Sequence, residues 1–158
     1  MWISFGLACG SLGGIAGYRL SVSDRLVAKE PVFIDETALE FSARFDTGAA
    51  ISSINACGIG VVGGSGTPQR SDEGKRVRFT VENAAGQNAR VETTIDQIRG
   101  IATSDCRELR YHVYLTVVYG GASYRLLMNL NDRRDSKDKL LLGRNWLRYG
   151  FVVEVSRT

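Results

Sequence analysis

Stretches in which apolar and polar residues alternate recur along the chain and predict β-strands with one buried face. The clearest is Leu39–Phe45 (LEFSARF), in which every second side chain is apolar. Two pairs of such stretches are separated by turn residues and therefore predict two β-hairpins. The first hairpin joins Arg76–Glu82 to residues 89–95, and the second joins residues 109–119 to residues 122–130.

The C-terminal part of the chain predicts a strand, a short helix and a final strand. Leu140–Leu142 is an apolar triplet that ends at Gly143, residues 144–149 predict one or two helical turns, and residues 151–155 predict a terminal strand. The whole pattern amounts to seven or eight short strands and one short C-terminal helix. It predicts an all-β fold, either a barrel or a sandwich.

Two segments between these elements read as loops. Residues 58–66 are rich in glycine, and residues 131–139 carry seven charged side chains in nine positions, which predicts a solvated loop. Residues 20–30 predict a polar linker. The folded domain is accordingly expected to span residues 31–158.

The N-terminal segment is the most apolar part of the sequence. Residues 2–18 contain no charged side chain, and as a helix they would span about 26 Å, slightly less than a hydrocarbon core of roughly 30 Å. We interpret residues 1–19 as a possible membrane anchor or signal segment. This places the protein in the cell envelope, anchored in the inner membrane or periplasmic. The alternatives are a wrongly chosen start codon or an ordinary buried segment of a cytoplasmic protein.

Composition and the absence of certain motifs exclude several classes of function. The chain has 158 residues, enough for one domain, and its net charge of +3 comes from interspersed charges with no basic stripe, so no nucleic-acid surface is expected. His112 is the single histidine, and it lies in an alternating stretch that favours a structural role. No zinc-protease or P-loop motif occurs, so neither a metal nor a cofactor is expected. Cys57 and Cys106 would pair in an oxidising compartment or serve as small buried residues.

One motif carries candidate catalytic chemistry. Asp46, Thr47 and Gly48 follow directly on the predicted strand Leu39–Phe45, and about 95 residues later an apolar triplet leads into Gly143. An aspartic protease needs a carboxylate at the tip of a strand, a hydroxyl beside it, and a glycine where the backbone turns tightly. An isolated Asp-Thr-Gly is a weak signal, but the second motif strengthens it.

The sequence around these motifs resembles the bacterial retropepsin-like aspartic endopeptidases, whose members often carry the label ATP-dependent zinc protease. The resemblance covers roughly residues 32–155 and is carried by ARFDTGA (43–49), SSINA (52–56), RVRF (76–79) and LLGRNWL (141–147). It implies a retropepsin-like acid-protease barrel that cleaves peptides or proteins as a homodimer. It also implies that Asp46 is catalytic and that the active-site loop is supported by Thr47, Gly48, Ala49, Leu142, Gly143 and Arg144.

The chain departs from the pattern of viral retropepsins at one position. Those proteins commonly carry an acidic residue four positions after the catalytic Asp, where it pairs with the Arg after the apolar-Gly motif. Ala50 occupies that position here, so Arg144 is expected to lack this partner. The flap that covers bound peptide has two candidates, residues 58–66 and the hairpin of residues 76–95.

Two further functions stay open at this point. The first is a catalytically silent retropepsin-fold module that binds peptides, and the second is a small β-barrel of unrelated function in which the Asp-Thr-Gly motif is a coincidence. The intact motif favours the endopeptidase, whereas Ala50 favours the silent module.

Overall fold

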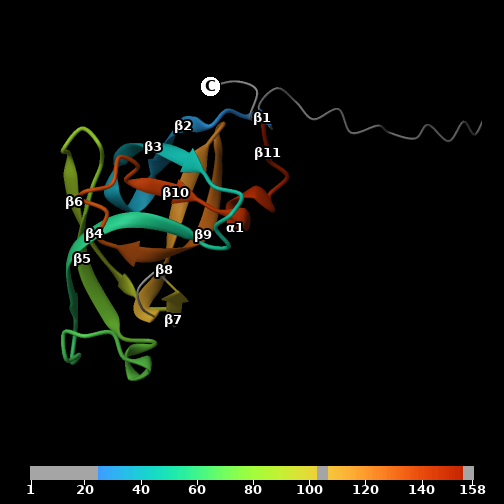
Figure 1. The fold of residues 1–158 in the computed structure, drawn as a ribbon. Coiled ribbons are helices and arrows are strands. Elements are labelled where there is room, and N and C mark those ends of the chain that lie inside the picture. Colours follow the sequence, from blue (N-terminus) through green and yellow to red (C-terminus); the bar gives the residue numbers. More distant parts are fainter. Residues whose placement is uncertain (1–24, 103–106, 155–158) are drawn as a thin grey trace, which may run out of the picture.

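The computed structural model describes residues 25–102 and 107–154 of the chain (Figure 1). Residues 1–19 and Cys106 lie outside the described residues. The proposed anchor or signal segment and the pairing of Cys57 with Cys106 therefore remain predictions. Among the residues described, no helix is both long enough and apolar enough to span a membrane.

The described residues are built almost entirely from strands, with one short α-helix. In chain order the elements are β1 (Arg25–Leu26), β2 (Lys29–Ile34), β3 (Leu39–Phe45), β4 (Ser52–Val61), β5 (Arg76–Glu82), β6 (Asn88–Thr94), β7 (Gln97–Ala102), β8 (Arg107–Tyr119), β9 (Ala122–Asn131), β10 (Leu140–Leu142), α1 (Arg144–Leu147) and β11 (Val152–Val153).

Six of the strands close into a barrel (Figure 1). Their order is β10-β3-β2-β8-β9-β4, and β4 pairs back onto β10. The strands β5 and β6 extend the sheet beyond β4, and β7 is added to β8. The all-β barrel with one short C-terminal helix that the sequence predicted is therefore confirmed.

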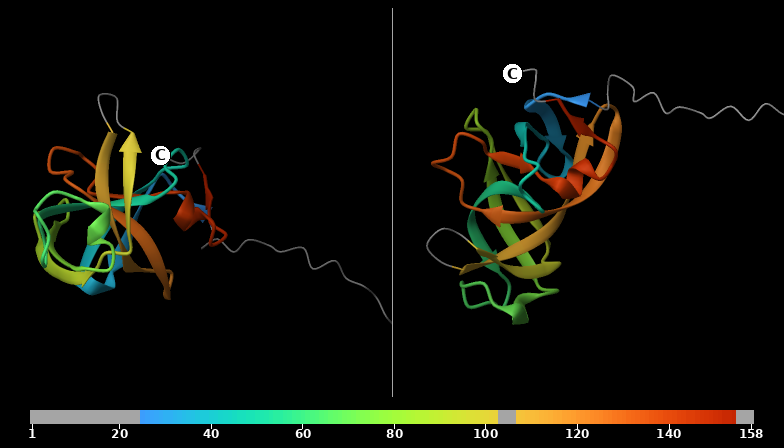
Figure 2. Two further views of the ribbon diagram at one scale, coloured as in Figure 1. Left: turned by 90° about the horizontal axis from the view of Figure 1, so that it is seen from below. Right: turned by 45° about the vertical axis from the view of Figure 1, so that its right-hand side comes forward.

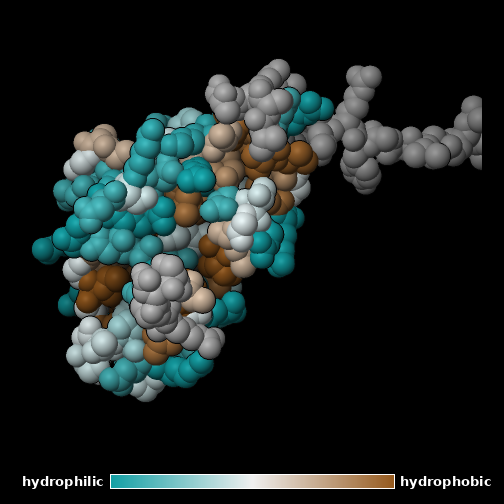
Figure 3. Space-filling model, viewed as in Figure 1, coloured by the Kyte–Doolittle hydropathy of each residue, from teal (hydrophilic) through white to brown (hydrophobic). Residues whose placement is uncertain are grey.

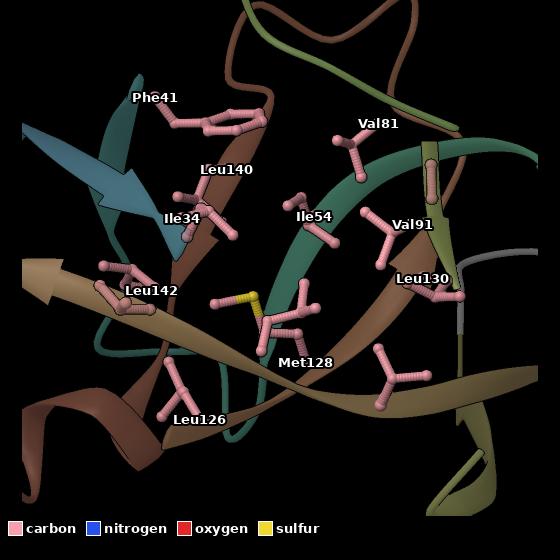
Figure 4. Packing of buried hydrophobic residues seen from close by; sticks show 14 of the residues in the cluster. Ile34, Phe41, Ile54, Val81, Val91, Leu126, Met128, Leu130, Leu140 and Leu142 are labelled. Carbon is pink, nitrogen blue, oxygen red and sulfur yellow. The ribbon is translucent and has the colours of Figure 1, made fainter. Parts of the chain in front are cut away.

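The alternating strands turn their apolar positions into the barrel. Along β3 the side chains of Phe41, Ala43 and Phe45 are buried, and along β9 Met128 and its alternate neighbours are buried as well. These side chains meet Ile54 of β4 in one continuous core (Figure 4). Because burying one large apolar side chain contributes about 1.5–3 kcal/mol, this core determines the register of the barrel strands.

The bounds of the two clearest predicted strands are those of the structure, but four strands, β1, β2, β4 and β7, were not predicted. β4 extends to Val61 and so includes the first part of the segment predicted as a loop at residues 58–66. Its residues 52–56 are all buried, which leaves no alternation to detect. β7 contains Gly100 and has no regular alternation; its pairing with β8 determines it.

Two segments expected to be solvated make tertiary contacts. Residues 25–30 of the predicted linker contain β1 and the start of β2, Leu26 is fully buried, and β1 pairs with β11. In the charged segment 131–139, Asp138 is 9% exposed and forms ion pairs with Lys29 and Arg44. Paired charges can be buried at a bend of the chain, so a high charge count did not make the whole segment solvated.

Aromatic packing fixes α1 against the barrel. Trp146 is fully buried, and its ring stacks on Phe151 with centroids 4.7 Å apart. Tyr124 of β9 meets Trp146 edge-on at 4.9 Å. Trp146, the third residue of α1, therefore anchors the helix to the core. The two residues before it, Arg144 and Asn145, face the loop between β3 and β4.

Candidate active site

Asp46 lies at the end of β3, where the barrel strand gives way to a loop. Phe45 is buried in the core, whereas Asp46 is half-buried and Thr47 and Gly48 are exposed. The N–H of Asp46 donates to the Leu142 carbonyl oxygen at 2.9 Å, which continues the parallel pairing of β3 with β10. The core thus anchors the residue before Asp46 and leaves its carboxylate near the surface.

The Asp46 carboxylate stabilises its own loop by accepting hydrogen bonds from the backbone of that loop. Its Oδ1 accepts hydrogen bonds from the backbone N–H groups of Gly48 at 2.8 Å and Ala49 at 3.2 Å. A Cβ atom on residue 48 would lie 3.1 Å from this oxygen, so glycine lets the backbone approach it closely. The side chain is therefore held in one orientation by its own loop.

Gly143 lies directly behind this loop. β10 runs between β3, which leads into the loop, and β4, which leads out of it. A Cβ atom on residue 143 would lie 2.7 Å from the Ala49 carbonyl oxygen and 3.2 Å from that of Ile51. The glycine after the apolar triplet is thus required by the close approach of two backbones.

Arg144 binds the loop from the first turn of α1. Its backbone N–H donates to the Ala49 carbonyl oxygen at 2.8 Å, and its guanidinium Nη1 donates to the carbonyl oxygens of Thr47 at 3.1 Å and Gly48 at 2.9 Å. The sequence predicted that Ala50 would leave Arg144 without its usual acidic partner. The structure gives the guanidinium two backbone carbonyls instead.

The residues named from the sequence thus lie together in one loop and the strand and helix behind it. A family model described as the retropepsin-like aspartic endopeptidase RimB (RimB-like) matches residues 26–158. The chain belongs to this family.

One solved structure supports the fold of this RimB-like chain. It is a Legionella pneumophila protein of unknown function (DUF785), with a TM-score of 0.68 and 24% sequence identity, and the match covers 85% of this chain and 95% of that one. A search of the curated proteins found no match. At this sequence identity the solved structure supports only the fold of the chain.

Two polar residues of this RimB-like site received no role from the sequence. Asn145 accepts hydrogen bonds at its side-chain Oδ1 from the N–H of Ser52 at 2.9 Å and from its hydroxyl at 2.8 Å. Both residues stand inside the motifs that carried the resemblance. The only signals in the sequence were a hydroxyl residue at the start of the SSINA motif and an amide directly after Gly143-Arg144.

The two flap candidates from the sequence remain predictions, and the structure shows how each segment is held. The turn of the β5–β6 hairpin is tied down, because Asn83 is 4% exposed and its Nδ2 donates to the Glu40 carbonyl oxygen at 2.9 Å. The segment 58–66 begins as part of β4. A third hairpin, β7–β8, stands out from the barrel (Figure 2, left).

No group of three or more His, Cys, Asp or Glu side chains within residues 25–102 and 107–154 is placed to hold a metal ion. His112 is fully buried among the strands, and its Nδ1 lies 3.0 Å from the Arg110 carbonyl oxygen. Cys57 is half-buried in β4.

Proposed function

We propose that the protein is a homodimeric aspartic endopeptidase in which each subunit contributes Asp46 to a shared catalytic pair. The observation that supports this most directly is the geometry of the Asp46 loop. The carboxylate is half-buried at a strand end, bonded by two backbone N–H groups, and backed by Gly143. Together with membership of the RimB-like family, this favours peptide-bond hydrolysis over an unrelated use of the loop.

The chemistry requires two such carboxylates. Two carboxylates about 3 Å apart cannot both be ionised, so the pair shares one proton. The ionised partner then activates a water molecule as a general base, and the protonated partner donates a hydrogen bond to the carbonyl oxygen of the scissile peptide bond. Asp46 is the only Asp in the sequence followed by Thr-Gly or Ser-Gly, so one chain supplies half of the site.

A two-fold axis beside the Asp46 loops would complete the pair. The surface near the two-stranded β1–β11 sheet is suited to contact a second copy, because Val152 is 48% exposed and Tyr149 is 50% exposed. Apolar atoms gather over β11 in the space-filling view (Figure 3). We therefore propose that terminal strands and the Asp46 loops form the dimer interface, and that residues 1–19 anchor the protein at the cell envelope.

The second candidate is a retropepsin-fold module that binds peptides without cleaving them. Ala50 favours it, because the ion pair beneath the catalytic loop of viral retropepsins cannot form here. The contacts of the Arg144 guanidinium with Thr47 and Gly48 favour the endopeptidase, since they supply a different support for the same loop.

The deciding experiment compares the full-length wild type with Asp46→Asn on a library of unstructured peptides. We expect Asp46→Asn to abolish cleavage and to leave the urea unfolding curve unchanged, because the substitution is isosteric and half-exposed. Asp135→Asn, at an exposed Asp in a loop, is the matched control and should cleave like wild type. Wild-type cleavage should be blocked by pepstatin-like peptides and not by a zinc chelator.

A mixing experiment tests the shared site. Excess Asp46→Asn added to wild type should suppress cleavage, because mixed dimers would contain only one native carboxylate. Cleavage that survives Asp46→Asn, or that a chelator removes, would overturn the endopeptidase. Selective peptide binding without any cleavage would instead favour the silent module.

A further inference from the structure

A connected set of hydrogen bonds lies beneath the Asp46 loop and joins three segments of the chain: the start of β4, residues 143–145 and β9. Ser52, fully buried at the start of β4, donates its hydroxyl and its backbone N–H to Asn145 Oδ1 at 2.8 Å and 2.9 Å. The same hydroxyl oxygen accepts the backbone N–H of Gly143 at 3.0 Å. Asn145 Nδ2 donates to the Leu127 carbonyl oxygen of β9 at 2.8 Å.

This set, which we call the Ser52–Asn145 clamp, touches the loop directly. Asn145 also donates its backbone N–H to the Ala50 carbonyl oxygen at 3.3 Å, and Ser52 is the residue at which the loop becomes β4. Ala49 lies between Gly143 and Asp46: its carbonyl oxygen accepts the Arg144 N–H, and its own N–H donates to Asp46 Oδ1. A shift of Gly143 against Ala49 would therefore be passed on to the carboxylate.

We propose that Ser52 and Asn145 are positioning residues that hold the Asp46 carboxylate in its catalytic orientation, in place of the ion pair that Ala50 cannot form. The proposal rests on the proposed endopeptidase function. The clamp consists of neutral hydroxyl, amide and backbone groups with their polar atoms paired. Buried hydrogen bonds of this kind are weakly affected by ionic strength, unlike an exposed ion pair.

The proposal predicts a specific kinetic effect for Ser52→Ala. The substitution leaves the Gly143 N–H without its partner and Asn145 Oδ1 with one donor fewer. Since a displacement of a catalytic group by about 1 Å can cost roughly 100-fold in rate, we expect kcat to fall by about 10- to 100-fold. KM should stay within about twofold, because Ser52 does not contact the exposed face of the loop, and Ser52→Thr, which keeps the hydroxyl, should restore most of kcat.

Thr37→Val is the matched control. The Thr37 hydroxyl is also buried and bridges two backbone groups, donating to the Ile34 carbonyl oxygen at 2.9 Å and accepting the Leu39 N–H at 3.1 Å. It lies before the start of β3, at the other end of the strand from Asp46. Thr37→Val should therefore lower stability without the large loss of kcat.

Amide hydrogen exchange provides a readout that does not depend on cleavage. In Ser52→Ala we expect faster exchange at the N–H groups of Arg144 and Ala49 than in wild type, with no such change in Thr37→Val. If Ser52→Ala does not fold, Ser52→Cys replaces the hydroxyl with a weak hydrogen-bonding thiol of similar shape and should give the same pattern.

The outcomes separate the two proposals. Equal losses of kcat in Ser52→Ala and Thr37→Val, or unchanged exchange at Arg144 and Ala49, would overturn the positioning role. If the wild type cleaves nothing, the endopeptidase proposal fails, and the exchange measurements still decide whether the clamp holds the loop.

Discussion

The backbone of Gly143 lies so close to the Ala49 carbonyl oxygen that a Cβ atom on residue 143 would come within 2.7 Å of it. Both backbones are held by hydrogen bonds: the Ala49 carbonyl oxygen accepts the Arg144 N–H, and the Gly143 N–H donates to the Ser52 hydroxyl. Neither can move aside cheaply. The contact is therefore a sensitive point of the fold and of the candidate site at once.

Gly143→Ala should lower the free energy of unfolding by about 1–3 kcal/mol, the usual cost of forcing extra atoms into a packed region. It should also reduce cleavage, because the Asp46 loop has to shift. Gly60→Ala is the control: a Cβ atom there meets nothing within 4 Å. Urea unfolding and peptide cleavage measure the two effects, and equal behaviour of the two variants would contradict the close contact.

If β11 lies in the dimer interface, a charged side chain on this strand should prevent dimer formation and therefore cleavage. Val152→Glu should convert the protein to an inactive monomer, because the exposed apolar side chain lies in the surface proposed to meet a second copy. Val62→Glu is matched to it, since Val62 is 53% exposed and Val152 is 48% exposed. Analytical ultracentrifugation should show dimers for wild type and Val62→Glu; dimeric Val152→Glu would place the interface elsewhere.

The phenol of Tyr111 is expected to ionise at a higher pH than its usual value. Burial, together with the hydrogen bond from its hydroxyl to Asp72 Oδ2 at 3.0 Å, raises the pKa of Tyr111 from 10.0 to about 12. Its contribution to stability is complete below pH 10.0 and is lost as the pH rises to about 12. Absorbance titration of Tyr111→Phe should lack the phenol that ionises near pH 12 in wild type. Tyr149→Phe, at an exposed tyrosine, should retain it.

The buried His112 is expected to make the stability of the protein sensitive to acid. Burial lowers its pKa from 6.5, as do the charges of Arg99 and Arg110, while the Arg110 carbonyl oxygen and Asp96 act in the opposite direction. The unfolded chain therefore binds a proton more readily than the native protein, and the folded state is destabilised as the pH falls below 6.5. Urea unfolding above and below this pH should show that loss in wild type and a smaller one in His112→Asn. Equal acid sensitivity of the two proteins would contradict this assignment.

Several strands could be predicted because they have one buried and one solvated face, and Leu140–Leu142 could be predicted because it is an apolar triplet that ends at Gly143. Leu39–Phe45, Arg76–Glu82 and Leu140–Leu142 have the same bounds in the sequence pattern and in the structure. Four strands were missed, and one of them, β2, begins inside the segment predicted as a polar linker. The start of β4 is buried on both faces, β7 is irregular and is defined by its partner β8, and Leu26 is buried within a segment of polar composition.

The candidate site was predictable as a set of motifs but not as a set of contacts. Asp46 was named because an Asp-Thr-Gly turn at a strand end suits aspartic-protease chemistry, and Gly143 was named because its motif resembles that of a known family. Nothing local indicated that the Arg144 guanidinium would bond to backbone carbonyls, or that Asn145 would bond to Ser52. Residues 93 or more positions apart make these contacts, and their pairing depends on how β10 inserts between β3 and β4.

The sequence by itself determined which strands are amphipathic and where the Asp-Thr-Gly turn interrupts one of them, because alternation and turn chemistry are properties of neighbouring residues. That residue 143 must be glycine follows from the tertiary structure, which brings the Ala49 carbonyl oxygen against it. The tertiary structure alone decided what supports the turn. Closing the barrel brings Gly143, Ser52 and Asn145 under Asp46, and only that closure turns separate polar residues into a connected network beneath one carboxylate.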